Sequence, residues 1–171
     1  LNTLIILKKN IIKFYIKMIF TNKNGNQINV IESDYNKNKN KDFKGIIISV
    51  HGIGSHFQDV GYQFKYNLEG RSLVFYQLGL LSYCLELEGH GLSQGERCCI
   101  YDFNDLVNDL KQLILILKEK NQNLPIYLMG FSMGGAIIVH LCIKYPNLVN
   151  GVILMAPMCG ITNSMRPSLP V

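Results

Sequence analysis

The chain has 171 residues, of which 48% are hydrophobic and 17% are charged. This length and composition suit one globular domain with a sizeable core, and they exclude a chain that is mostly disordered. The uninterrupted apolar runs are much shorter than the roughly 18 residues of a membrane span, so we expect a soluble domain.

The net charge of +5 is concentrated near the N-terminus. Residues 1–44 hold nine lysines against three acidic side chains, a net of +6, whereas the remaining residues hold eight basic and nine acidic side chains, a net of −1. A nucleic-acid-binding domain would carry its basic residues over the folded surface. The distribution therefore argues against nucleic acid as a partner.

Residues 1–20 are predicted to form a basic amphipathic arm or leader, separate from the domain at 21–171. Lys9, Lys13 and Lys17 recur every four residues beside several isoleucines, so a helix would carry a basic stripe next to an apolar one. Such a helix could contact an anionic membrane surface. The alternatives are an edge strand or a poorly ordered leader.

Next along the chain, Asn24-Gly25 predicts a turn between two short strands, and the Asn/Lys run at 36–41 predicts a solvated loop. Four short apolar runs without polar alternation then follow, typical of strands buried in a parallel sheet. These runs are Ile46–Val50, Leu80–Leu87, Ile126–Met129 and Val152–Met155.

Helical periodicity separates several of these strands. Apolar residues recur at spacings of three and four from Phe103 to Leu117, and a second helix is predicted from Ala136 to Lys144, before Pro146. The alternation predicts an α/β fold with a doubly wound, mostly parallel sheet. In such sheets the chemistry lies at the carboxyl ends of the strands.

The five cysteines show no spacing that would suit a disulfide framework or a zinc site. They are therefore predicted to be buried free thiols, which weakly favours a reducing compartment. They are Cys84, Cys98, Cys99, Cys142 and Cys159.

The central motif is Gly130-Phe131-Ser132-Met133-Gly134-Gly135, which follows a predicted strand and opens a predicted helix. That is the context of a G-x-S-x-G nucleophile elbow. The turn is so tight that Ser132 must adopt a strained backbone, and side chains larger than hydrogen at 130 and 134 would collide. The alternative is a plain strand-to-helix turn.

An acyl-transfer site also needs two backbone N–H groups directed at the developing oxyanion. Met133, the residue after the nucleophile, would supply one, and the loop at His51-Gly52-Ile53-Gly54 would supply the other from Ile53. His51 is expected to shape this loop rather than to transfer protons.

A third glycine-rich segment, Gly89 to Arg97, follows the strand at 80–87. Its His90 resembles a catalytic base at first sight. In these sheets, however, the base follows the nucleophile and the acid along the chain, so we do not assign His90 that role.

Taken together, these motifs resemble the serine hydrolases of the α/β-hydrolase fold, in the branch of monoacylglycerol lipases and lysophospholipases (the serine aminopeptidase S33-type family). The matching segments are His51–His56, Gly89–Arg97, Asp102-Phe103 and Leu124–Ala136. The resemblance implies hydrolysis of a carboxylic ester in a monoacyl lipid, with Ser132 as nucleophile and Ile53 and Met133 as oxyanion donors. Ser55 departs from the acidic residue of many members, and residues 61–70 look like a local insertion.

The base and acid of a catalytic triad are not found in this chain. No Asp or Glu follows Ser132, and the one later histidine, His140, would lie about 12 Å away along the helix. The resemblance places the missing residues, a cap and the last strands beyond residue 171. We therefore expect a C-terminally truncated, N-terminal part of the fold that is inactive by itself, with 152–155 as an exposed edge strand.

Two main hypotheses follow. The first is an ester hydrolase that acts on a small lipid through an acyl-enzyme, without metal or organic cofactor. The second is an inactive relic or interaction module that keeps the sheet and the elbow. A peptidase or thioesterase on the same fold is a further alternative. We expect a cytoplasmic location, with membrane contact through the arm as an option.

Overall fold

The computed structural model describes residues 15–33, 37–38, 41–57, 68–121 and 124–160. The predicted arm at residues 1–14 and most of the predicted insertion at 61–70 lie outside the described residues. The sheet starts at Tyr15, so residues 15–20 of the predicted arm belong to an edge strand.

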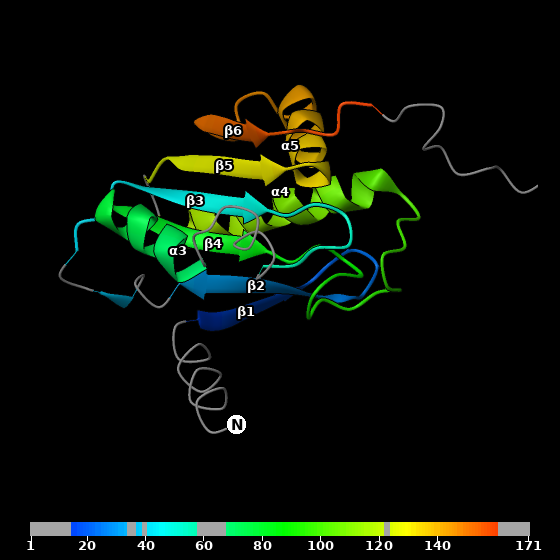
Figure 1. Cartoon of the computed structure of the whole chain (residues 1–171), viewed down its shortest axis with the longest axis horizontal. Helices are drawn as coiled ribbons and strands as arrows, with labels where there is room; N and C mark the ends of the chain where they lie inside the picture. The colour runs from blue at the N-terminus through cyan, green and yellow to red at the C-terminus, as the bar shows by residue number, and fades with distance from the viewer. Residues whose placement is uncertain (1–14, 34–36, 39–40, 58–67, 122–123, 161–171) are drawn as a thin grey trace, which may run out of the picture.

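Six strands form one sheet in the order β1-β2-β4-β3-β5-β6 (Figure 1). Strand β1 pairs antiparallel with β2, and β2 pairs antiparallel with β4, whereas β4, β3, β5 and β6 are mutually parallel. The strands are β1 Tyr15–Thr21, β2 Gln27–Ser33, β3 Gly45–Val50, β4 Leu80–Leu85, β5 Ile126–Phe131 and β6 Gly151–Met155. This confirms the α/β class and the mostly parallel sheet.

Within the described residues, three helices flank the sheet. Helix α3 (Leu68–Gln77) covers one face, and α4 (Phe103–Lys120) and α5 (Met133–Lys144) lie on the other (Figure 1). Helix α3 was not predicted, because its sequence has no clear apolar stripe and includes Gly70. None of the described helices combines the length and the apolar character needed to cross a membrane.

The core lies between the sheet and helices α4 and α5. Strand β3 is buried along its whole length, as its unbroken apolar sequence predicts. Helix α4 begins after Asp102, whose side chain accepts a hydrogen bond from the Asn104 N–H at 2.8 Å. Its buried face consists of Leu106, Val107, Asp109, Leu110, Leu113, Ile114 and Leu117.

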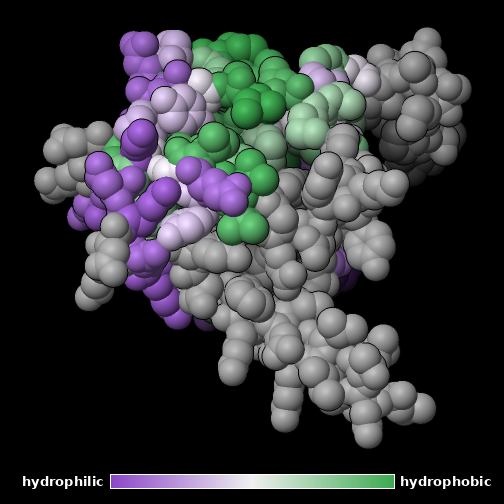
Figure 2. Space-filling view, turned by 60° about the vertical axis from the view of Figure 1, so that its left-hand side comes forward, coloured by the Kyte–Doolittle hydropathy of each residue, from purple (hydrophilic) through white to green (hydrophobic). Residues whose placement is uncertain are grey.

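Strand β6 differs from the other parallel strands because it forms an edge of the sheet. Val152, Ile153 and Leu154 are 42%, 50% and 38% exposed. Figure 2 shows apolar side chains gathered on the part of the surface where β6 lies. The general prediction of full burial is therefore wrong for this strand, and the expectation of an exposed edge at 152–155 is confirmed.

The prediction of buried thiols is also wrong for most of the cysteines. Only Cys84, on the central strand β4, is buried. Cys98 and Cys159 are exposed, and Cys99 and Cys142 are half-buried. Cys98, Cys99 and Cys159 lie in loops, where no periodic pattern indicates burial, and Cys142 lies on helix α5.

Candidate active site

Ser132 lies between β5 and α5, at the carboxyl edge of the parallel strands. Its backbone angles are φ 51° and ψ −117°, an uncommon conformation for a residue with a side chain. Such strain persists only where the surrounding structure enforces it, and it is typical of the nucleophile at a sharp strand-to-helix turn. The backbone thus has the strained form expected of an elbow.

The glycines around Ser132 are required by close contacts. A Cβ atom on Gly134 would lie 2.2 Å from the Val50 carbonyl oxygen, and one on Gly130 would lie 2.7 Å from the Gly134 carbonyl carbon. A Cβ on Gly135 would lie 2.8 Å from the Pro157 Cβ. The collisions expected at 130 and 134 are therefore present.

Hydrogen bonds from the end of β6 and from the residues after it hold the strained serine in place. The Ser132 N–H donates to the Met155 carbonyl at 3.1 Å, and the Met158 N–H donates to the Ser132 carbonyl at 3.0 Å. The Gly135 N–H donates to the same carbonyl at 3.0 Å. Sequence reasoning missed this support, because it comes from residues more than twenty positions away.

The loop after β3 lies directly beside Ser132. A Cβ on Gly52 would be 3.2 Å from the Ser132 Cβ, so glycine allows the loop to approach closely. Ile53 follows and is exposed, whereas Met133 opens α5 and is buried. The first N–H groups of a helix have no partner within the helix and favour negative charge. The two segments that carry the predicted oxyanion donors therefore meet at Ser132.

His51 is fully buried, and both of its ring nitrogens have partners. Nε2 accepts a hydrogen bond from the Leu87 N–H at 3.1 Å, and Nδ1 lies 2.7 Å from the Gly52 carbonyl oxygen. Because Nε2 is an acceptor, the proton is on Nδ1, which donates to Gly52. His51 therefore links the loop after β3 to the end of β4, in agreement with the predicted structural role.

His90 is also buried, with its ring centroid 5.3 Å from that of His51. Its Nδ1 lies 2.8 Å from the Glu88 carbonyl oxygen, and its Nε2 has no hydrogen-bond partner among the described residues. His140, in contrast, lies on the exposed side of α5 and contacts the edge of the Phe103 ring. His140 therefore has a packing contact with Phe103, and no contact with Ser132 is seen among the described residues.

Glu86 organises the loop that carries His90, and sequence reasoning missed it. Its buried carboxylate accepts hydrogen bonds from the Asn29 side-chain amide at 2.6 Å and from the Leu92 N–H at 2.8 Å. A Cβ on Gly91 would lie 2.2 Å from Glu86 Oε1. The sequence signal that could have indicated this role is an acidic residue directly after a mostly apolar, buried strand.

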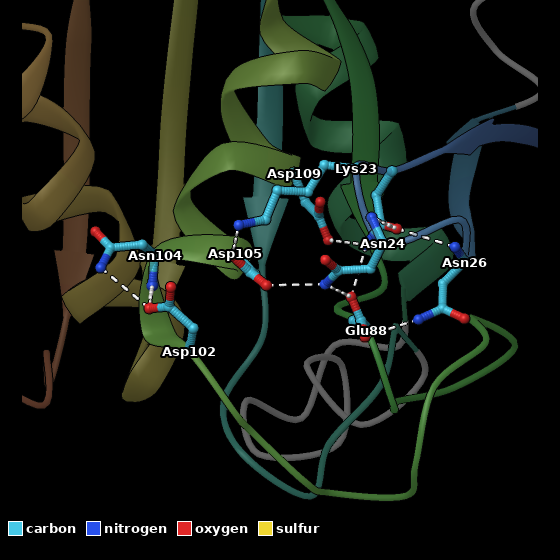
Figure 3. A network of polar contacts seen from close by, with 9 residues as sticks. Lys23, Asn24, Asn26, Glu88, Asp102, Asn104, Asp105 and Asp109 are labelled. Atoms are coloured by element: carbon cyan, nitrogen blue, oxygen red, sulfur yellow. Dashed lines mark hydrogen bonds and ion pairs between the residues drawn. The ribbon is translucent and has the colours of Figure 1, made fainter.

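A second polar network connects the β1–β2 turn to α4 (Figure 3). Asn26 donates to Glu88 at 2.8 Å, Asn24 donates to Asp105 at 2.8 Å, and Lys23 forms an ion pair with Asp105. The described residues contain no group of three or more His, Cys, Asp or Glu side chains that could hold a metal ion. The network joins the β1–β2 turn to Glu88 and to the first turn of α4.

Asp109 is the buried carboxylate of this network. Its pKa is raised to about 7, mainly by burial; the neighbouring Glu88 and Asp105 charges contribute to the rise, and a hydrogen bond from Asn22 opposes it. Asn22 donates to Asp109 at 3.2 Å and to Glu88 at 2.6 Å. One amide group is thus shared between two carboxylates.

Solved structures with a similar fold define the class. A thermostable carboxyl esterase from Bacillus coagulans superposes with a TM-score of 0.66 at 20% identity, covering 82% of this chain and 44% of that one. An esterase from Pyrococcus furiosus gives 0.65 at 19% identity, covering 86% and 51%. These neighbours, with the sheet order and the strained serine, show the α/β-hydrolase fold, of which this chain covers the N-terminal portion.

The model of the family "Serine aminopeptidase, S33" matches residues 41–171, and the chain belongs to this family. Human monoglyceride lipase is 33% identical over 115 residues, which are 67% of this chain and 35% of that protein. The monoacylglycerol lipase of Mycolicibacterium smegmatis is 28% identical over 131 residues, 75% of this chain and 43% of the relative. The chain thus spans less than half the length of these relatives.

Proposed function

We propose that this chain is the nucleophile-bearing part of an ester hydrolase that acts on monoacyl lipids. The observation that carries the proposal is the strained backbone of Ser132 at the junction of β5 and α5. The strain holds the serine oxygen at the carboxyl edge of the sheet, where the loop after β3 approaches it. The monoglyceride lipase relatives support a monoacylglycerol, or a related lysophospholipid, as the substrate class.

In this mechanism Ser132 attacks the acyl carbonyl carbon and forms a tetrahedral intermediate. The N–H groups of Ile53 and Met133 stabilise the negative charge on its oxygen, and collapse expels the glycerol or headgroup alcohol. Water then releases the fatty acid from the acyl-enzyme. No step in this scheme requires a metal or an organic cofactor.

A base must take the Ser132 proton, and an acid must orient that base. His51 is unsuited to this role because both ring nitrogens are bonded to the backbone. We therefore propose that an acid and a histidine beyond residue 171 complete the triad. The alternative is an inactive relic that keeps the sheet and the elbow.

The test is labelling with a fluorophosphonate probe, which reacts only with an activated serine. We would compare the 171-residue chain with a longer product of the same reading frame that includes a downstream Asp and His. Ser132→Ala in each is the control. We expect adduct formation at Ser132, and hydrolysis of monoacylglycerol, only in the longer chain.

Labelling of the short chain would overturn the role of a distant base and bring His90 back into consideration. Absence of labelling in both folded proteins would favour the relic. Labelling of the longer chain with hydrolysis of thioesters or peptides, but not of monoacyl lipids, would keep the nucleophile and reject the substrate class.

A cytoplasmic location, with contact to a membrane surface as an option, remains a prediction, which subcellular fractionation tests.

A further inference from the structure

The loop between β4 and α4 carries two adjacent cysteines that the hydrolase mechanism does not use. Cys98 is exposed and Cys99 is half-buried. Neighbouring residues of the chain have Cα atoms about 3.8 Å apart, so the two thiols can be brought together by local rotations, without movement of a distant segment. This pair is therefore a built-in dithiol at the surface.

The backbone around the pair is already bent. Cys98 has a φ of 55°, one of three positive values among the described non-glycine residues. Its N–H donates to the Gly89 carbonyl at 3.1 Å, and the Cys99 N–H donates to the Glu96 carbonyl at 3.2 Å. The two cysteines thus close the loop that carries His90.

The two thiols have different surroundings. The hydroxyl group of Tyr101 is hydrogen-bonded to the Glu96 carboxylate, and its pKa is raised by that bond and then by an interaction with the Cys99 side chain. Cys99 therefore lies against the Tyr101–Glu96 pair. Cys98 is open to reagents in the solvent.

We propose that Cys98 and Cys99 are a reversible redox site, which a peroxide converts to a disulfide between adjacent residues. The Cys98 thiol first loses its proton to the solvent, and its thiolate attacks one oxygen of hydrogen peroxide. The O–O bond breaks, Cys98 sulfenic acid forms, and the hydroxide that leaves takes up a proton from the solvent to become water. The Cys99 sulfur then attacks the Cys98 sulfur, the S–O bond breaks, and a second water leaves with the Cys99 proton. The two thiols lose two electrons, and peroxide is reduced to two waters.

Reversibility follows from the spacing. Disulfides usually join Cα atoms 4.4–6.8 Å apart, which is more than adjacent residues allow. The bridge would therefore be strained, and strained or exposed disulfides are the ones that thiols readily reduce. The site is suited to a labile modification rather than to a permanent cross-link.

Closing the bridge would also move the loop. The peptide group between Cys98 and Cys99 must rotate to join the sulfur atoms, and its N–H is the group bonded to Glu96. Glu96 in turn holds the Tyr101 hydroxyl. Oxidation is therefore expected to change the environment of Tyr101, and this inference does not depend on ester hydrolysis.

The experiment treats the folded chain with hydrogen peroxide and follows the tryptic peptide 98–111, which contains only these two cysteines. We expect a loss of about 2 Da from this peptide, restored by dithiothreitol, and a change in tyrosine ultraviolet absorption. Cys98→Ser and Cys99→Ser should each abolish the loss. Cys159→Ser, which removes another exposed thiol, should leave it unchanged.

Three results would overturn the proposal. One is irreversible oxidation of Cys98 to the sulfinic acid in the unmodified chain. Another is a disulfide from Cys98 to Cys159 or to a second molecule in place of the adjacent bridge. The last is a loss of about 2 Da that persists in Cys98→Ser or Cys99→Ser, which would show that the adjacent bridge is not its source. Unchanged tyrosine absorption in a protein that carries the bridge would contradict only the predicted movement of the loop. Circular dichroism of each variant confirms that it is folded.

Discussion

At the scale of single residues, the elbow depends on glycines, because its backbone leaves no room for a Cβ atom. Gly134 lies where a Cβ would meet the Val50 carbonyl oxygen at 2.2 Å, and backbone atoms of a central strand cannot easily move. We expect Gly134→Ala to lower the free energy of unfolding by about 1–3 kcal/mol, the usual cost of overpacking. Urea denaturation measures this cost.

Gly160→Ala is the matched control for this substitution. A Cβ there meets nothing within 4 Å, so stability should stay within about 0.5 kcal/mol of the original chain. Equal effects of the two substitutions would show that the contact at Gly134 is not the cause.

Asp109 provides a residue-scale prediction of pH dependence. Its pKa is about 7 in the fold and 3.8 when unperturbed, so between these values the folded state holds a proton that the unfolded state has released. The stability that protonated Asp109 contributes is complete below about pH 4 and is lost as the pH rises toward 7. Over this range the free energy of unfolding should fall by at most about 1.4 kcal/mol per pH unit.

Asp109→Asn should remove this contribution, because the amide does not titrate. Denaturation curves at several pH values compare the two proteins, and the variant should show the flatter dependence between pH 4 and 7. An unchanged slope would mean that a group other than Asp109 dominates the pH response.

At the scale of elements, α4 holds the sheet through a single apolar face. Ile114 is fully buried, whereas Leu115, the next residue on the same helix, is 47% exposed. We expect Ile114→Ala to cost about 2–5 kcal/mol and Leu115→Ala to cost less than about 1 kcal/mol. Thermal and urea denaturation of the pair would show whether the core lies on this face, and similar costs would contradict that assignment.

The elements also show what sequence could and could not predict. Strands β3 to β6 were predicted from their short apolar runs, and helices α4 and α5 from their local sequence, α4 by its apolar spacing and α5 by its end before Pro146. Helix α3 was missed, because it lacks an apolar stripe. At the site, the elbow was predicted from its motif, whereas the bonds from Met155 and Met158 were not, because they join segments distant in sequence.

At the scale of the whole molecule, the exposed edge strand β6 is the feature most relevant to self-association. Native edge strands usually carry charges or proline, yet residues 151–155 carry neither. The strand has the character of an interior strand, so we expect the chain to self-associate through it. Ile153→Lys should reduce association measured by sedimentation velocity.

Ile143→Lys is the control, because Ile143 is 76% exposed and belongs to helix α5 rather than to the edge strand β6. It changes charge and surface hydrophobicity in the same way but should not alter association. If both substitutions disperse the protein equally, general surface hydrophobicity rather than the strand edge is responsible.

The hydrogen bonds to Ser132 have a consequence for biosynthesis. Ser132 is held through both its N–H and its carbonyl by Met155 and Met158, which are synthesised more than twenty residues later. Chains fold from the N-terminus as they leave the ribosome. While residues 155–158 are still within the exit tunnel, nothing on the far side of the turn can hold the serine in its strained form. We therefore expect the strained conformation of Ser132 to be completed only after translation has passed β6.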